Sequence, residues 1–285
     1  MRAHGPVTEV PEAAAADHLC WVHDDGAAFD DAVRDFLAGG LDRGERLLCV
    51  GERAIAALAG ATGPLRDVDA LVARGALSTM TVDEVYAAAG PLVVERQRAY
   101  YEEASRRALD DGYRGLRVVA ELTGLAADPE QRDLLARWEH AADEFMASGP
   151  GMSAMCAYRA DLPPATLGAL LSVHPQGRGD EHLSPYRLFF ADDAVRLTGS
   201  VDASNAERLA ATLAGTPVGA SPVLDVSGLE FLDVAGYRAL AGWAADLGSR
   251  GLTSEIRGAS ALVRRVWQVL DLDAVAPVTF AAPHG

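Results

Sequence analysis

Two carboxylates follow apolar runs that have the length and composition of buried strands. Glu52 comes directly after the run at 46–51, and Glu121 stands near the end of the run at 115–122. Ligands of open parallel sheets usually bind outside the carboxyl ends of the strands, so both carboxylates are expected to line one crevice. Arg117 lies four residues before Glu121, on the same face of the strand. From the residues alone, a ligand site that includes Glu121 and Arg117, and a structural salt bridge between Arg117, Glu121 and a neighbouring residue, remain equally open.

A second polar group lies in the strand-like run at 18–24. His18 and His23 stand on either side of Trp21, and Asp24 follows them. Five residues is an odd step along a strand, so the two imidazoles are expected to point to opposite faces and to share no metal ion. All four side chains are candidates for ligand binding. The alternative is one surface histidine and one half-buried histidine without a ligand.

The three cysteines predict neither a disulfide nor a metal centre. Cys20, Cys49 and Cys156 are far apart in the sequence, and they form no CxxC pair and no zinc-binding spacing. Buried free thiols in a reducing cytoplasm account for them. We therefore expect no metal ligands in this chain.

Sequence motifs of common enzymes are absent as well. Every basic residue is an arginine, so the phosphate-binding loop GxxxxGK[ST] is impossible, and GxGxxG, HExxH and GxSxG do not occur. We expect no catalytic residue and no cofactor. The alternative is a degenerate nucleotide-binding enzyme that uses Glu52 and Glu121. Arg117 or Arg53 would then have to supply the positive charge that phosphoryl transfer needs.

The net charge of the chain argues against a nucleic acid as its partner. The 285 residues include 41 acidic and 25 basic ones, and the net charge is −16. A phosphate backbone would be repelled, so no nucleic-acid partner is expected. No uninterrupted apolar stretch approaches the roughly 18 residues of a membrane span, and the N-terminus has no run of signal-peptide type. A cytoplasmic protein without membrane contact is the prediction.

Strand-like and helix-like segments alternate along most of the chain, which is typical of a parallel sheet with helices on both faces. They are followed by a segment of Pro, Gly and charged residues without apolar periodicity, which is typical of a linker. The predicted organisation is a flexible tail at 1–16, a first domain at 17–176, a linker at 177–185 and a second domain at 186–285.

The second domain is expected to be a small α/β layer, and its most informative stretch is D-V-S-G-L-E-F-L-D-V-A-G-Y-R-A-L at 225–240. A buried strand at 221–228 is expected to lead into a tight loop, and Asp233 stands just before a helix. An aspartate at this position accepts backbone N–H bonds and complements the helix dipole. A plain helix cap accounts for Asp233, and a functional surface is the alternative.

This stretch resembles the STAS domain of the anti-sigma factor antagonists, over about residues 186–280. The likeness rests on D-V-S-G-L and F-L-D before an apolar helix, and on L-T-G-S-V-D at 197–202. The resemblance implies a small sheet flanked by helices. It also implies a protein partner, an anti-sigma factor or a related regulatory ATPase or kinase, which docks around the motif. The residues that it places in this contact are Asp233, Val234, Ala235, Tyr237 and Arg238.

The resemblance further implies control by phosphorylation of a Ser or Thr directly after the motif aspartate, because a dianion there disrupts the contact. Val234 occupies this position and Ala235 the next, and neither has a hydroxyl group. We therefore expect the docking surface without the usual phosphorylation site.

The first domain resembles the MEDS family, the sensory domain of methanogen and methylotroph regulators. The likeness rests on H-L-C-W-V-H-D at 18–24, G-L-D-R-G-E-R-L-L-C-V at 40–50, G-Y-R-G-L-R-V-V-A-E-L at 112–122, and A-M-C-A-Y at 154–158 followed by His174-Pro175. The resemblance implies a RecA-like three-layer domain that has lost its phosphate loop, which agrees with the missing motif. It also implies sensing of a small molecule, with hydrocarbon derivatives proposed for some members.

The sequence thus predicts a non-catalytic signalling protein. The first domain is expected to sense a small hydrophobic ligand or a partner, and the second to bind an anti-sigma factor or regulatory kinase. The oligomeric state stays open, self-association included.

Overall fold

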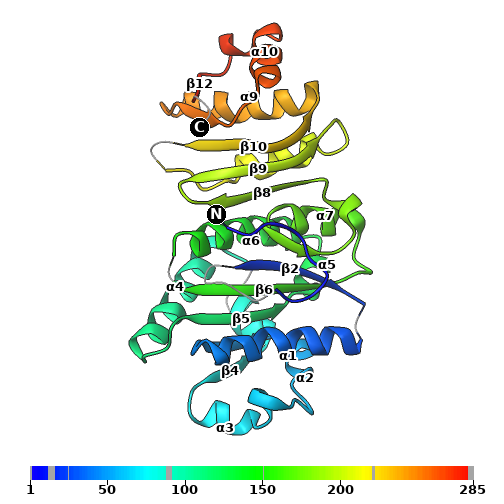
Figure 1. Cartoon of the computed structure of the whole chain (residues 1–285), viewed down its shortest axis with the longest axis vertical. Coiled ribbons are helices and arrows are strands. Elements are labelled where there is room, and N and C mark those ends of the chain that lie inside the picture. Colours follow the sequence, from blue (N-terminus) through cyan, green and yellow to red (C-terminus); the bar gives the residue numbers. More distant parts are fainter. Residues whose placement is uncertain are drawn as a thin grey trace. The chain divides into compact units, whose positions relative to one another are not determined.

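The chain folds into two compact units, Arg2–Leu183 and Ser184–Gly285. The structure is a computed structural model, and it describes residues 2–11, 17–24, 26–87, 92–149, 151–219 and 222–281. Both units are built on a β-sheet with helices packed against it, so the predicted α/β class is confirmed (Figure 1).

The first unit contains a sheet of seven strands in the order β1-β7-β2-β6-β5-β3-β4, in which every neighbouring pair is parallel. Its strands are β1 (Gly5–Pro6), β2 (His18–His23), β3 (Arg46–Val50), β4 (Leu77–Met80), β5 (Leu116–Glu121), β6 (Met152–Arg159) and β7 (Gln176–Arg178). The central strands are almost wholly buried. This explains their near-continuous apolar runs, because parallel sheets are covered on both faces.

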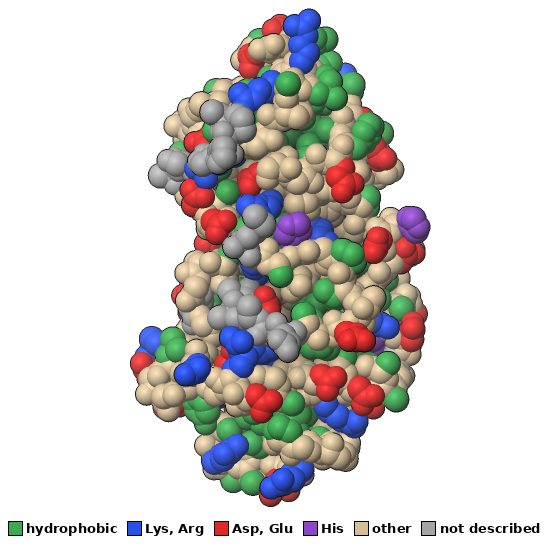
Figure 2. Space-filling view, in the orientation of Figure 1, with side chains coloured by type: hydrophobic (Ala, Val, Ile, Leu, Met, Phe, Trp, Pro, Cys, Tyr) green, Lys and Arg blue, Asp and Glu red, His purple; other side chains and the backbone are tan. Residues whose placement is uncertain are grey.

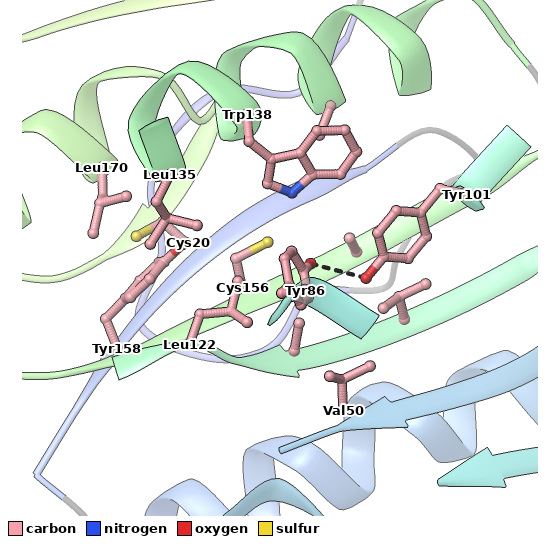
Figure 3. Close-up of a cluster of buried hydrophobic side chains, with 14 of the residues drawn as sticks. Cys20, Val50, Tyr86, Tyr101, Leu122, Leu135, Trp138, Cys156, Tyr158 and Leu170 are labelled. Atoms are coloured by element: carbon pink, nitrogen blue, oxygen red, sulfur yellow. Dashed lines mark hydrogen bonds between the residues drawn. The ribbon is translucent and has the colours of Figure 1, made fainter. Parts of the chain in front are cut away.

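Helices cover both faces of this sheet and complete the three predicted layers. One face packs against α1 (Ala27–Asp42), α2 (Glu52–Ala56) and α3 (Val68–Ala73). The opposite face packs against α4 (Val94–Asp110), α5 (Thr123–Ala127), α6 (Arg132–Ala147) and α7 (Pro164–Ser172). On this second face Trp138 stacks on Tyr101 with 5.5 Å between ring centroids, and the hydroxyls of Tyr101 and Tyr86 are 2.8 Å apart (Figure 3).

The described part of the predicted tail differs from a flexible segment. Gly5 and Pro6 form β1, which pairs with β7, and the guanidinium of Arg2 lies 2.8 Å from the carboxylate of Asp143. Residues 1 and 12–16 of the predicted tail lie outside the described residues.

The predicted linker at 177–185 also differs from the structure. Its first residues belong to β7, which is inserted between β1 and β2, and Glu181–Leu183 form a short 3-10 helix. Composition gave no sign of this strand, because its hydrogen bonds come from backbone groups and its side chains are not apolar.

The second unit has a five-stranded sheet in the order β12-β11-β10-β9-β8, where β8 and β9 are antiparallel and the other pairs are parallel. Its elements are β8 (Tyr186–Ala191), β9 (Ala194–Val201), α8 (Ala206–Ala214), β10 (Val223–Leu232), α9 (Val234–Ser249), β11 (Ser254–Arg257), α10 (Ala261–Val269) and β12 (Val278–Phe280). A turn at Asp192-Asp193 joins β8 to β9, and Asp192 takes the left-handed conformation with φ 56°.

The end of β10 differs from the prediction. The strand does not stop at residue 228 but continues to Leu232, with register shifts between Asp225 and Gly228 and between Leu229 and Phe231. Such bulges insert unpaired residues and interrupt the alternation that marks a strand in sequence.

Among the described residues, no helix combines the length and apolar character that crossing a bilayer requires.

Candidate functional site

Four ionisable side chains meet inside the first unit, on the face covered by α6 and α7. His18 comes from β2, Cys156 from β6, Glu139 from α6 and His174 from the turn after α7. Glu139 Oε2 lies 3.2 Å from His18 Nε2, 3.2 Å from Cys156 Sγ and 3.5 Å from His174 Nε2. Cys156 Sγ and His18 Nε2 are 3.6 Å apart. One atom of each residue therefore faces a common centre, and these atoms all lie within 4.8 Å of one another.

The parallel pairing of β2 and β6 brings two of these groups together. His18 lies opposite Ala154 and Cys20 opposite Cys156, so His18 and Cys156 point to the same face of the sheet. Glu139 projects from the buried side of α6 and is completely buried itself. Burying a carboxylate is costly unless it is paired and hydrogen-bonded, so its partners are part of the fold.

Each histidine of this cluster has a hydrogen-bonding partner on the side away from the centre. His18 Nδ1 is 3.2 Å from Asp143 Oδ1, and His174 Nδ1 donates to the carbonyl oxygen of Leu170 at 2.7 Å. An N–H on Nδ1 of His174 leaves the lone pair of a neutral imidazole on Nε2, which points inward.

Glu139 is oriented in the same way. Its Oε1 accepts a hydrogen bond of 2.6 Å from the hydroxyl of Tyr158, which leaves Oε2 at the centre. Figure 3 shows Cys156 and Tyr158 projecting from their strand toward the helix that carries Leu135 and Trp138. Outer partners thus orient His18, His174 and Glu139.

The pKa values of the four side chains are shifted in different directions from their usual values. Burial favours a neutral His18, but hydrogen bonds to Asp143 and Glu139 outweigh it and raise the pKa of His18 above its usual value. Burial opposes the charge of Glu139, but the bonds with His174 and His18 hold the pKa of this carboxyl well below its usual range. Burial, followed by the neighbouring Glu139, raises the pKa of the Cys156 thiol. Burial and His18 lower the pKa of His174.

The sequence predicted no metal-ligand set, and of these four residues only His18 was a candidate for ligand binding. Glu139, Cys156 and His174 are distant along the chain, so no local spacing could identify them. Glu139 and Asp143 do carry a signal, since they stand four residues apart on α6 and flank its buried apolar residues. A pair of carboxylates inside an apolar stripe requires buried partners.

His23 lies on the opposite face from His18, as expected from the odd spacing. Its ring stacks on Phe29 with 3.8 Å between centroids, and its Nε2 is 3.8 Å from Glu121 Oε1. The alternative of a surface histidine is wrong, because His18 and His23 are both buried. The reason is that β2 is a central strand covered by helices on both sides.

Glu52 and Glu121 line one crevice of about 490 Å³ at the carboxyl ends of β3 and β5. Asp83 and Asp128 also line it, so its charged groups are acidic. One oxygen of Glu121 accepts hydrogen bonds from the backbone and side chain of Thr123. The two carboxylates are close in space, and their role in ligand binding stays a prediction.

Arg117 does not pair with Glu121. Its Nε donates to Glu45 Oε2 at 2.5 Å, and its guanidinium lies over the ring of Phe36 at 4.6 Å. A strand rises about 3.3 Å per residue, so residues four apart on one face are separated by about 13 Å. Arg117 is 1% exposed and lies outside the crevice.

Two other candidates also lie outside the crevice. Trp21 is buried in the core under α1, where Arg178 lies 5.1 Å from its ring centroid, and Asp24 is exposed just after β2. Of the seven predicted ligand-binding residues, the crevice unites Glu52 and Glu121, with His23 beside Glu121.

A second hollow of about 380 Å³ lies between α4 and the strands β3 and β4. Its lining is largely apolar, with Arg46, Glu103 and Arg107 as its charged members. The apolar and aromatic members are Leu47, Leu48, Met80, Tyr100, Ala104 and Leu116.

In the second unit, Asp233 caps α9 as predicted. Its Oδ1 accepts from the backbone N–H of Gly236 at 2.9 Å, and its Oδ2 accepts from the N–H of Ala203 at 2.9 Å. Phe231 and Val234, on either side of it, are 54% and 44% exposed. Two exposed apolar side chains thus flank the capped start of α9, Phe231 at the end of β10 and Val234 in the first turn of the helix.

The other predicted contact residues differ in exposure. Arg238 is exposed and Ala235 is half-buried, but Tyr237 is only 3% exposed, and burial raises its pKa. Tyr237 therefore lies inside the unit and not on this surface.

Charges are mixed on the face of the molecule shown in Figure 2. Arginine side chains are scattered there among acidic ones and form no continuous basic area. This distribution agrees with the net charge of −16 in giving no support to nucleic-acid binding.

Comparisons with known proteins divide the chain into two parts that correspond to the two compact units of the fold. A family model described as "MEthanogen/methylotroph, DcmR Sensory domain" (MEDS) matches residues 17–175, and one described as "Mlab, STAS domain" matches residues 186–278. No curated protein matches. Among solved structures, the DUF1998 helicase MrfA bound to DNA and AMPPNP is similar with 12% identity and a TM-score of 0.28, over 93% of this chain and 39% of that one. This chain thus spans about two fifths of the helicase, and a likeness of that degree supports no argument.

Proposed function

Because this chain belongs to the MEDS family and carries a STAS domain after its MEDS domain, we propose that it is a cytoplasmic signalling protein. The MEDS domain senses a small molecule, and the STAS domain binds an anti-sigma factor or a related regulatory kinase. A ligand can transmit a signal only if it has different affinities for two states of the protein, and the partner then reports the difference.

The observation that carries this proposal is the surface formed by Phe231, Val234 and Arg238 around the cap of α9. Two exposed apolar residues beside a charged one make a suitable centre for a protein contact, where apolar area is buried within a polar rim. Asp233 fixes the start of the helix, so little ordering is required on binding.

Replacing Val234 with aspartate should weaken binding of the purified anti-sigma-type kinase about tenfold or more, because a charge then enters an apolar contact. The fold should tolerate the change, since an aspartate in the first turn of a helix is favourable. Isothermal titration of the full chain with the kinase measures the effect.

The matched control is Leu262→Asp. Leu262 is 70% exposed and also lies in the first turn of a helix, α10, which Ser260 caps. Its replacement should leave the affinity unchanged. Equal affinities of the Val234→Asp variant and the wild type would place the contact elsewhere.

The absence of a hydroxyl at positions 234 and 235 gives a second test. Incubation with the kinase and ATP should add no phosphate within residues 225–240, which mass spectrometry of that peptide measures. Phosphate on Ser227 or Tyr237, the hydroxyl residues of the segment, would contradict the proposed independence from phosphorylation.

For the ligand, the apolar hollow beside α4 suits a small hydrophobic molecule better than the acidic crevice does. The predicted ligand class and the predicted residues Glu52 and Glu121 therefore favour different sites.

The alternative function, a degenerate nucleotide-binding enzyme, would use the acidic crevice. Its carboxylates Glu52, Asp83, Glu121 and Asp128 would repel phosphate groups. Calorimetry with ATP and magnesium separates the two functions, and binding accompanied by turnover would replace the signalling proposal with the enzymatic one.

A further inference from the structure

We propose that His18, Glu139, Cys156 and His174 bind one zinc ion inside the MEDS domain. The ligand atoms are Nε2 of each histidine, Oε2 of Glu139 and Sγ of Cys156, which already face one centre. This inference rests on these side chains alone and does not depend on the proposed signalling function.

The distances between these atoms match those of a tetrahedral zinc site. With Zn–N and Zn–O bonds of about 2.0–2.1 Å and a Zn–S bond of about 2.3 Å, ligand atoms lie about 3.3–3.6 Å apart. Four of the six separations at the centre are 3.2, 3.2, 3.5 and 3.6 Å. The two other separations, from His174 Nε2 to His18 Nε2 and to Cys156 Sγ, lie within 4.8 Å, so zinc binding would draw the side chain of His174 toward the centre.

The outer partners are those that metal ligands normally have. Ligating histidines donate their other ring N–H to a carboxylate or a carbonyl group, and ligating carboxylates are themselves hydrogen-bonded. Asp143 is the outer partner of His18, the carbonyl group of Leu170 that of His174, and Tyr158 that of Glu139.

Charge and ligand type both favour zinc. With Glu139 as carboxylate and Cys156 as thiolate, a divalent cation makes the buried four-ligand set neutral. Asp143 is balanced separately by Arg2 at 2.8 Å. Zinc displaces the thiol proton of Cys156, which leaves to solvent as the Zn–S bond forms. A thiolate and two imidazoles suit zinc, whereas magnesium and calcium prefer oxygen ligands.

The site would be structural. All four ligands come from the protein and are buried, so no position is left for a catalytic water. The ion would join α6 and the turn after α7 to β2 and β6, four segments that are far apart in the sequence.

Metal analysis of the untagged full chain, purified from zinc-supplemented cells, tests the proposal. The wild type should contain about one zinc ion per chain, and the Cys156→Ala and His174→Gln variants about a tenth of that or less. Cys49→Ala is the matched control, because Cys49 is also buried on a central strand but belongs to the core of the opposite face. It should retain its zinc.

A ligand variant that fails to fold would lose zinc for a different reason. Cobalt substitution avoids this problem, because it is measured on the wild-type chain. Cobalt in the wild-type chain should give thiolate-to-metal absorption and the strong visible bands of a tetrahedral site. The Tyr158→Phe variant should bind zinc about 10–100-fold more weakly in competition with a chelator. A wild type that takes up neither metal, or a Cys156→Ala variant with full zinc content, would overturn the assignment.

Discussion

Replacing Arg117 with methionine should destabilise the MEDS domain by about 3–5 kcal/mol, because it breaks a buried ion pair and leaves one charge behind. Glu45 is 5% exposed and would lose its buried cation. Its other ionic partner, Arg43, has a side chain that is 45% exposed and would compensate little. Methionine fills much of the volume over Phe36, so the loss of charge dominates the result.

Urea unfolding followed by hydrogen exchange of peptides from residues 17–176 measures this effect. Peptides from the second unit serve as an internal reference, since that unit is compact by itself. The double variant Arg117→Met/Glu45→Gln should be more stable than Arg117→Met, because it removes the stranded charge. Unfolding of Arg117→Met at the wild-type urea concentration would mean that the buried pair contributes nothing to stability.

Replacing Gly199 with alanine should destabilise the STAS domain by about 2–4 kcal/mol, from backbone strain and a displaced hydrogen bond. Gly199 lies in β9 with φ +84°, and a Cβ atom there would be 2.3 Å from the carbonyl oxygen of Pro185. That oxygen accepts a hydrogen bond of 2.8 Å from the N–H of Ser200, so the clash cannot be relieved without opening this contact.

Gly242→Ala in α9 is the control for this prediction. A Cβ atom at Gly242 meets nothing within 4 Å. Alanine should therefore stabilise the helix by up to about 1 kcal/mol through its higher helix propensity. The same exchange measurement, read on peptides from residues 186–280, compares the two variants. Equal stability of Gly199→Ala and Gly242→Ala would remove the structural explanation for the glycine of the L-T-G-S-V-D motif.

The elements that could be predicted well from the sequence are those whose residue types indicate that they are buried. The apolar runs of β2, β3 and β5 could be predicted because central parallel strands are buried on both faces. The helix after Asp233 was found because its cap and apolar periodicity agree. By contrast, β1 and β7 are two and three residues long and depend on backbone pairing, which leaves no trace in residue type.

The polar sites were predictable only in part. Glu52 and Glu121 could be placed together because both follow strands of one parallel sheet. The cluster around Glu139 could not be predicted, because its members are far apart in the sequence. Glu139 contacts His18, which is 121 positions away, and Cys156, which is 17 positions away. Tyr237 was assigned to the surface from its place in a motif, although its position on α9 turns it inward.

The position of β7 matters for any attempt to dissect this protein. The MEDS family match ends at residue 175, one residue before a strand that separates β1 from β2 and pairs with both. A truncation at the family boundary would therefore strip an inner strand from the sheet and detach the N-terminal residues from it. The place to cut is the pair Ser184-Pro185, between the end of the 3-10 helix and the first strand of the STAS domain.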